Sequence, residues 1–184
     1  MRQQQILTTT ALTAVALLSS WYIKTHVLEN KSSTTEIPQI IARDIEQLHY
    51  TPEGTLAYRL KATDMQEFHK RNITRLTQPK LRTYLPPSNW YASARQGTVR
   101  HDKQQDIVLR GNVIAQRIAN RTNSALTIKT TQLTIHPGSQ TADTDQAVTI
   151  TQDHITTHGV GMHANLKTGI VQLKAQLHSE IEPH

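Results

Sequence analysis

The sequence has 184 residues, no cysteine and a formal net charge of +6. This length suits one compact domain with an appendage, and the lack of cysteine excludes disulfides, thiolate metal sites and a lipid-modified cysteine. The positive charge favours anionic partners such as phosphorylated lipid. Aromatic residues make up only 4% of the sequence, which is few for a protein that stacks on single-stranded bases, so we expect no nucleic acid partner.

The first patterned segment is the uncharged run from Ile6 to Ile23. As a helix of roughly 18 residues it would span about 27 Å, just enough for the hydrocarbon core of a bilayer. Trp21 and Tyr22 lie at its outer end, where such rings prefer the headgroup level, and Arg2 precedes it. We therefore predict a single-pass membrane anchor over residues 1–24, with a cytoplasmic N-terminus and the main domain on the outer side of the membrane.

A cleaved signal peptide is the alternative interpretation of this segment. Ala14-Val15-Ala16 has the small-x-small pattern of a cleavage site, but it falls inside the apolar run. Residues 25–39 are polar and contain Ser32-Ser33-Thr34-Thr35 and Pro38, which predicts a linker to the domain.

From Ile40 onward, apolar and polar residues alternate with period two, and turn residues interrupt the alternation about every ten residues. This pattern is typical of half-buried antiparallel strands, and the abundant β-branched threonine supports it. Residues predicted to mark structural turns include Pro52, Gly54, Gly111 and Gly159. We predict an all-β domain over residues 40–184, a sandwich, jelly roll or barrel of short strands.

The inward-facing positions of these strands are medium-sized aliphatic residues with few aromatics. They could form an ordinary core, or they could line a groove left partly open for acyl chains; periodicity does not separate the two. The candidate lining residues are Leu56, Tyr58, Leu60, Trp90, Leu109, Val113, Leu126, Ile128, Leu133, Ile135, Val148, Ile150, Met162 and Leu166.

The last predicted strand runs from Ile170 to Ile181. A final strand often lies at a sheet edge, where unpaired N–H and C=O groups can accept a strand from another protein. The candidate edge residues for such pairing are Val171, Gln172, Leu173, Lys174, Ala175, Gln176 and Leu177.

Several segments together resemble the LptC family. They are Y-T-P-E-G-T-L-A-Y-R-L from Tyr50 to Leu60, T-Q-P at Thr77–Pro79, L-R-G-N-V at Leu109–Val113, the alternating run from Leu126 to Val148, and G-V-G-M-H-A-N-L at Gly159–Leu166. The resemblance covers residues 40–181. It departs from the family at Gln152, where a glycine is common, which puts the local turn in doubt.

The resemblance implies a twisted, partly open, OstA-like β-jelly roll in the periplasm, behind a single-pass anchor in the inner membrane. It implies a non-enzymatic protein that accepts lipopolysaccharide from the LptB–LptF–LptG transporter and passes it to LptA through end-to-end β-strand pairing, without cofactor or metal. Two alternatives are a signal-cleaved soluble carrier resembling LptA, and a jelly-roll sugar-binding protein or enzyme. An enzyme should place polar and acidic residues on its inward faces, whereas these faces are aliphatic.

Two groups of polar residues were candidates for further chemistry. His154, His158 and His163 lie close in sequence, but no carboxylate or cysteine completes a metal site, so we expect no bound metal. The basic residues Arg71, Arg75, Lys80, Arg82, Arg117 and Arg121 could meet lipid phosphates, and the plainer interpretation places them on a solvated rim.

Overall fold

The computed structural model describes residues 37–84, 89–102, 105–121 and 123–181. By its internal contacts the chain divides into two units, Met1–Glu36 and Ile37–His184, and every described residue belongs to the second. The predicted anchor and most of the predicted linker lie outside the described residues. Within the described ranges, no helix is long and apolar enough to cross a membrane.

The described residues form one antiparallel sheet of eleven strands, which confirms the all-β class. The strands are β1 (Ile40–Tyr50), β2 (Leu56–Phe68), β3 (Ile73–Thr77), β4 (Lys80–Thr83), β5 (Trp90–Ser93), β6 (Gln96–Arg100), β7 (Ile107–Arg117), β8 (Leu126–His136), β9 (Thr141–Gln152), β10 (Ile155–Asn165) and β11 (Val171–Ile181). A 3-10 helix, η1 (His69–Arg71), follows β2. The prediction of short strands is wrong for seven of them, which have 11 to 13 residues.

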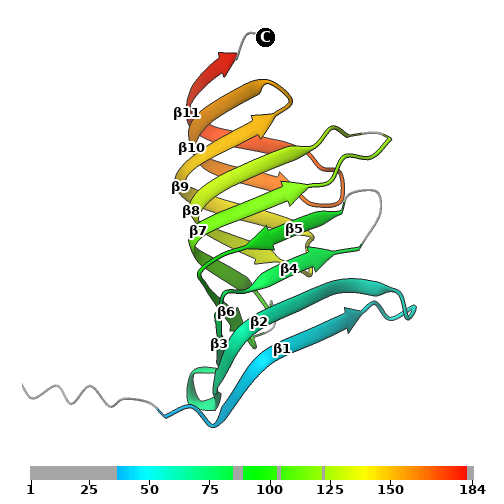
Figure 1. Ribbon diagram of the computed structural model, residues 1–184, viewed down its shortest axis with the longest axis vertical. Helices are drawn as coiled ribbons and strands as arrows, with labels where there is room; N and C mark the ends of the chain where they lie inside the picture. Colours follow the sequence, from blue (N-terminus) through cyan, green and yellow to red (C-terminus); the bar gives the residue numbers. More distant parts are fainter. Residues whose placement is uncertain (1–36, 85–88, 103–104, 122, 182–184) are drawn as a thin grey trace, which may run out of the picture. The chain divides into compact units, whose positions relative to one another are not determined.

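The sheet is folded along its middle, so that each long strand contributes one half to each of two facing layers (Figure 1). In the first layer β2 pairs with β4, β4 with β5, and β5 with the C-terminal half of β7. In the second layer β2 pairs with β3, β3 with β6, and β6 with the N-terminal half of β7. The strands β8 to β11 continue both layers beyond β7, and β1 continues them beyond β2.

The fold line runs through positions where strand pairing changes register. Such bulges bend a strand and increase its twist, which lets a single strand turn the corner between the layers. These shifts lie between Arg110 and Val113, between Thr130 and Thr134, and between Val160 and Met162. Strands that would otherwise need a turn therefore run on into the opposite layer.

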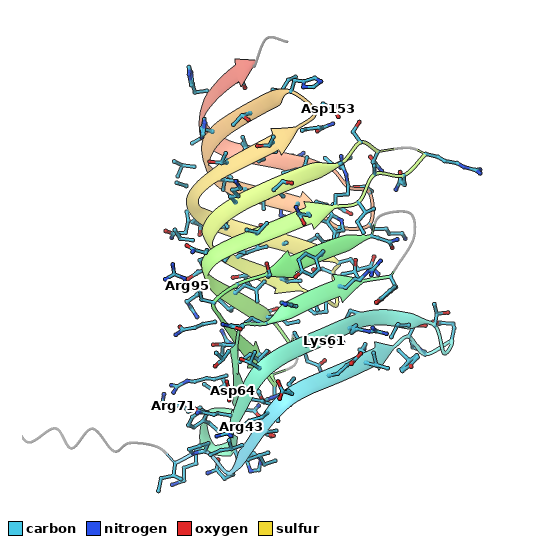
Figure 2. All side chains as sticks on the ribbon, viewed as in Figure 1. Arg43, Lys61, Asp64, Arg71, Arg95 and Asp153 are labelled. Carbon is cyan, nitrogen blue, oxygen red and sulfur yellow. The ribbon has the colours of Figure 1, made fainter. Side chains whose placement is uncertain are left out.

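Two glycines at the bend have backbone conformations that favour glycine. Gly111 has φ +76° and Gly161 has φ +72°, in the left-handed region that L residues adopt at a cost. Figure 2 shows Arg95 on the outside of this bend, and a Cβ at Gly111 would lie 3.3 Å from the Arg95 Cβ. The prediction of turns at Gly111 and Gly159 is wrong, because both glycines lie inside strands, at register shifts. Gly54 lies in the β1–β2 turn with Pro52.

The hydrophobic core lies between the layers. Period-two alternation sends every second side chain inward, so that Ile128 is 1% exposed while its neighbour Lys129 faces outward and is exposed. Among the described residues, β1 pairs only with β2 and β11 only with β10, so this sheet ends in two open edges.

Candidate functional site

The two layers are not packed against each other along their whole length, and two cavities open between them. The lower cavity, near β1, has a volume of about 320 Å³. The upper cavity, below β11, has a volume of about 420 Å³. We call the space between the layers, with both cavities, the trough.

The lower cavity lies between the β1–β2 end of the first layer and the turns of the second. From the first layer it is lined by His49, Tyr50 and Tyr58, and the rings of His49 and Tyr58 stack with centroids 4.7 Å apart. From the second layer it is lined by Ile135 and Leu166 among others. Partial burial raises the pKa of the Tyr58 phenol above its usual value, since desolvation disfavours the phenolate.

The upper cavity is lined by Leu126 and Ile150 from the first layer and by Val171 and Leu173 from the second. The other lining residues are Gln152, Thr157, Lys174 and Ala175. Four of the lining residues, Val171, Leu173, Lys174 and Ala175, therefore belong to the edge strand β11. The trough reaches the open edge of the sheet, and any strand added to β11 would extend its wall.

Between these cavities the trough is filled by side chains. The interior space there is only about 20 Å³, too little for a ligand. Ile128, Leu133 and Met162 fill it and are at most 2% exposed. This part of the domain is an ordinary close-packed core.

The structure divides the predicted groove residues into three groups. Tyr58, Ile135 and Leu166 line the lower cavity, and Leu126 and Ile150 line the upper one. Trp90, Ile128, Leu133 and Met162 surround the filled interior, which Ile135 and Leu166 also touch. The residues that line none of these three spaces are Leu56, Leu60, Leu109, Val113 and Val148.

A set of hydrogen bonds joins the layers at the boundary between the two cavities. The indole Nε1 of Trp90 donates to the carbonyl oxygen of Leu166 at 3.1 Å. The guanidinium of Arg117 donates through Nη1 to the carbonyl oxygen of Gly169 and through Nε and Nη2 to that of Ser124, at 3.1 and 2.9 Å. We call Trp90, Arg117 and the β10–β11 turn (residues 166–170) the latch.

The solvated-rim interpretation is wrong for Arg117, which is 6% exposed, whereas Arg121 is exposed. In β7, Arg117 has the inward orientation of Val113 and Ala115. Its burial lowers the pKa of the guanidinium, because desolvation disfavours the cation. The period-two alternation along β7 predicts that Arg117 faces inward. The solvated-rim interpretation relied instead on its charge, because charged side chains are normally exposed.

The candidate histidines are held apart. In β10, His158 pairs within the first layer and its Nδ1 lies 3.1 Å from the Thr149 hydroxyl. His163 pairs within the second layer, and its Nδ1 lies 2.7 Å from a carboxylate oxygen of Asp143. His154 lies in the β9–β10 turn. In the described part of the chain, no group of three or more metal-ligating side chains is arranged to hold an ion.

The candidate partner strand lies in β11, from Val171 to Leu177. The N–H of Asn165 donates to the carbonyl of Ile170 at 2.9 Å, so Ile170 directs its carbonyl toward β10. Since these directions alternate in an antiparallel ladder, the N–H groups of Val171 and Leu173 point away from β10, toward the open edge.

Comparison with known proteins identifies a similar fold and a family. No curated protein sequence matches the chain. Among solved structures, the chain resembles LptH from Pseudomonas aeruginosa, described as the LptA-homologous periplasmic component of the conserved lipopolysaccharide transport device. The identity is 10%, the match covers 68% of this chain and 95% of LptH, and the TM-score is 0.56, which supports the jelly-roll fold. The family model described as lipopolysaccharide-assembly, LptC-related, matches residues 8–182, and the chain therefore belongs to the LptC family.

Proposed function

We propose that this protein carries lipopolysaccharide from the inner membrane to LptA. In this proposal residues 1–24 anchor the chain in the inner membrane beside LptF and LptG, and residues 25–39 link the anchor to the periplasmic domain. The domain accepts the lipid that the LptB–LptF–LptG transporter extracts and passes it on. It does so without catalysis, cofactor or metal.

The observation that carries the proposal is the pair of cavities between the layers, each of which is lined in part by aliphatic side chains. A lipid that crosses an aqueous gap must keep its acyl chains from water, at about 0.8 kcal/mol per exposed CH₂ group. The lower cavity offers Ile135 and Leu166 to such chains, and the upper cavity offers Ile150 and Leu173. The headgroup would remain at the side of the trough opposite the bend, which we call its open side.

The two open edges give the trough a direction. We assign the β11 edge to LptA, because the upper cavity ends there, and the β1 edge to the transporter side. Pairing would satisfy the outward N–H groups of Val171 and Leu173 and continue the trough into the partner.

Replacing Val171 tests the docking edge. Val171→Pro removes an outward N–H that β10 does not use, and should abolish LptA binding in a pull-down. Val171→Ala shortens the same side chain, keeps the N–H and should retain binding. If a folded Val171→Pro variant still binds LptA, β11 is not the docking edge.

The cavities are tested by site-specific photocrosslinking to lipopolysaccharide. A photoreactive residue at Tyr58 or at Ile150 should crosslink to the lipid. The same residue at Lys129, which faces outward from β8, should not. Equal labelling at all three positions would show that the lipid does not bind in the trough.

The anchor is tested separately by sequencing the N-terminus of the mature chain from membrane fractions. We expect a chain that retains Met1 or Arg2 and sediments with the inner membrane. A mature chain that begins near Trp21 or later would support the soluble, signal-cleaved carrier instead.

A further inference from the structure

The latch separates the two halves of the trough. Leu166, which accepts the Trp90 bond, lines the lower cavity. Leu126, the pairing partner of Arg117 in β8, lines the upper cavity, as does Val171, two residues after Gly169. A headgroup that moves along the open side from one cavity to the other must therefore pass the point where the latch joins the layers.

Arg117 is an unusual residue for such a place. It is a cation at 6% exposure, and its hydrogen bonds go to the backbone carbonyls of Ser124 and Gly169. Among the described residues no carboxylate forms an ion pair with it. A buried charge that has only neutral partners is costly, and an opposite charge would compensate it.

The hydrogen bonds of Arg117 leave room for such a partner. A guanidinium carries five N–H groups in a planar fork, and the three bonds to Ser124 and Gly169 use three of them. One of the two remaining N–H groups is on Nη2, and the other is on Nη1, the nitrogen that donates to Gly169. A phosphate that takes over Nη1 would therefore compete with the Gly169 carbonyl. Phosphate oxygens accept from such a pair in a bidentate arrangement that neutral carbonyls cannot match in strength.

We propose that Arg117 binds a phosphate group of the lipid headgroup, and that the phosphate replaces the Gly169 carbonyl as its partner and so opens the latch. This inference rests on the proposed function. The exchange needs no covalent step: the Arg117–Gly169 bond is lost, the β10–β11 turn is released from the first layer, and the headgroup occupies the gap. The cation would act as a selector that admits a phosphorylated lipid to the upper cavity.

The experiment uses the full-length chain with a photoreactive residue at Tyr58 or at Ile150. The two probes are lipid A with its phosphates and the same lipid A after enzymatic removal of the phosphates. Both lipids should label Tyr58 in the lower cavity. At Ile150 in the upper cavity, the phosphorylated lipid should give about tenfold more labelling, the size expected from a charge-assisted bond to phosphate.

Variants at Arg117 separate this role from a structural one. Arg117→Met should bring the labelling ratio at Ile150 close to one, and Arg117→Lys should retain part of the preference. Arg121→Met removes an exposed cation from the same β7–β8 connection and should leave the ratio unchanged. If Arg117→Met does not fold, the labelling ratios of the wild-type chain and of Arg117→Lys still test whether Arg117 selects the phosphorylated lipid.

Different outcomes would refute the role of Arg117 and the proposed lipid transport. Labelling of both cavities by both lipids to the same extent in the wild-type chain overturns the role of Arg117 and leaves lipid transport in place. No labelling at either position by either lipid defeats the proposed function itself. Inorganic phosphate in tenfold excess should not change the ratio at Ile150; a loss of the preference would assign Arg117 to free phosphate and overturn the lipid assignment.

Discussion

Replacing Gly161 by alanine should destabilise the bend that forms the trough. Gly161 has φ +72°, and a Cβ there would lie 2.9 Å from Cδ and 3.1 Å from Cβ of Lys174. The left-handed backbone alone costs a non-glycine residue about 1–3 kcal/mol. The lower entropy of the unfolded alanine chain offsets about 0.4–1 kcal/mol. Lys174 must also move, and its amino group forms a 2.7 Å ion pair with Asp145.

We therefore expect Gly161→Ala to lower the free energy of unfolding by about 1–2 kcal/mol, and the melting temperature by about 3–8 °C in a domain of this size. Circular dichroism during urea and thermal unfolding of the purified full-length chain measures both quantities.

Two other glycines serve as matched controls for this experiment. At Gly54, φ is +80° and nothing lies within 4 Å of an added Cβ, so Gly54→Ala isolates the backbone cost. At Gly138 the space is also open and the backbone is not left-handed, so Gly138→Ala should be neutral or stabilising by about 0.4–1 kcal/mol. If Gly161→Ala is as stable as Gly138→Ala, the bend does not depend on the conformation of Gly161.

Further predictions concern the interior and its titration. Ile128→Ala should lower the free energy of unfolding by about 2–5 kcal/mol, because the side chain is 1% exposed and its removal leaves a cavity. Lys129→Ala, on the outer face of the same strand, should change it by less than about 0.5 kcal/mol; similar losses at both would contradict the inward–outward assignment. Burial raises the pKa of the Tyr58 phenol above 10.0. The stability that the protonated phenol contributes is therefore fully present below pH 10 and is lost as the pH rises through the folded-state pKa. Tyr58→Phe should lessen the alkaline loss of stability in unfolding measured between about pH 9 and 11, and an unchanged profile would contradict that cause.

The inward and outward faces could be predicted from the sequence because side chains alternate along a strand. Leu109 and Ile128 are buried as their parity predicts, and Lys129 is exposed. The sequence did not predict that single long strands run through both layers, because a glycine inside a bulge and a glycine in a turn have the same sequence signal. Gly111 and Gly159 therefore predict turns, although both lie inside strands.

The candidate site shows a similar division. Ile135 and Ile150 were predicted to face inward, as Val113 was, and share its aliphatic character, yet they line cavities and Val113 does not. Which inward residues line open space depends on how far the layers separate at each level, and this is set by long-range pairing. Arg117 was misplaced because a charge is normally exposed, and its bonds to Ser124 and Gly169 depend on tertiary contacts.

Transfer of lipopolysaccharide from the transporter to LptA through this protein can be measured in reconstituted liposomes. The liposomes contain LptB, LptF, LptG, this chain and lipopolysaccharide, with soluble LptA outside. We expect ATP-dependent crosslinking of lipopolysaccharide to LptA with the wild-type chain and with Val171→Ala, and none with Val171→Pro or without the chain. Equal ATP-dependent delivery to LptA when the chain is left out would show that the protein does not carry the lipid.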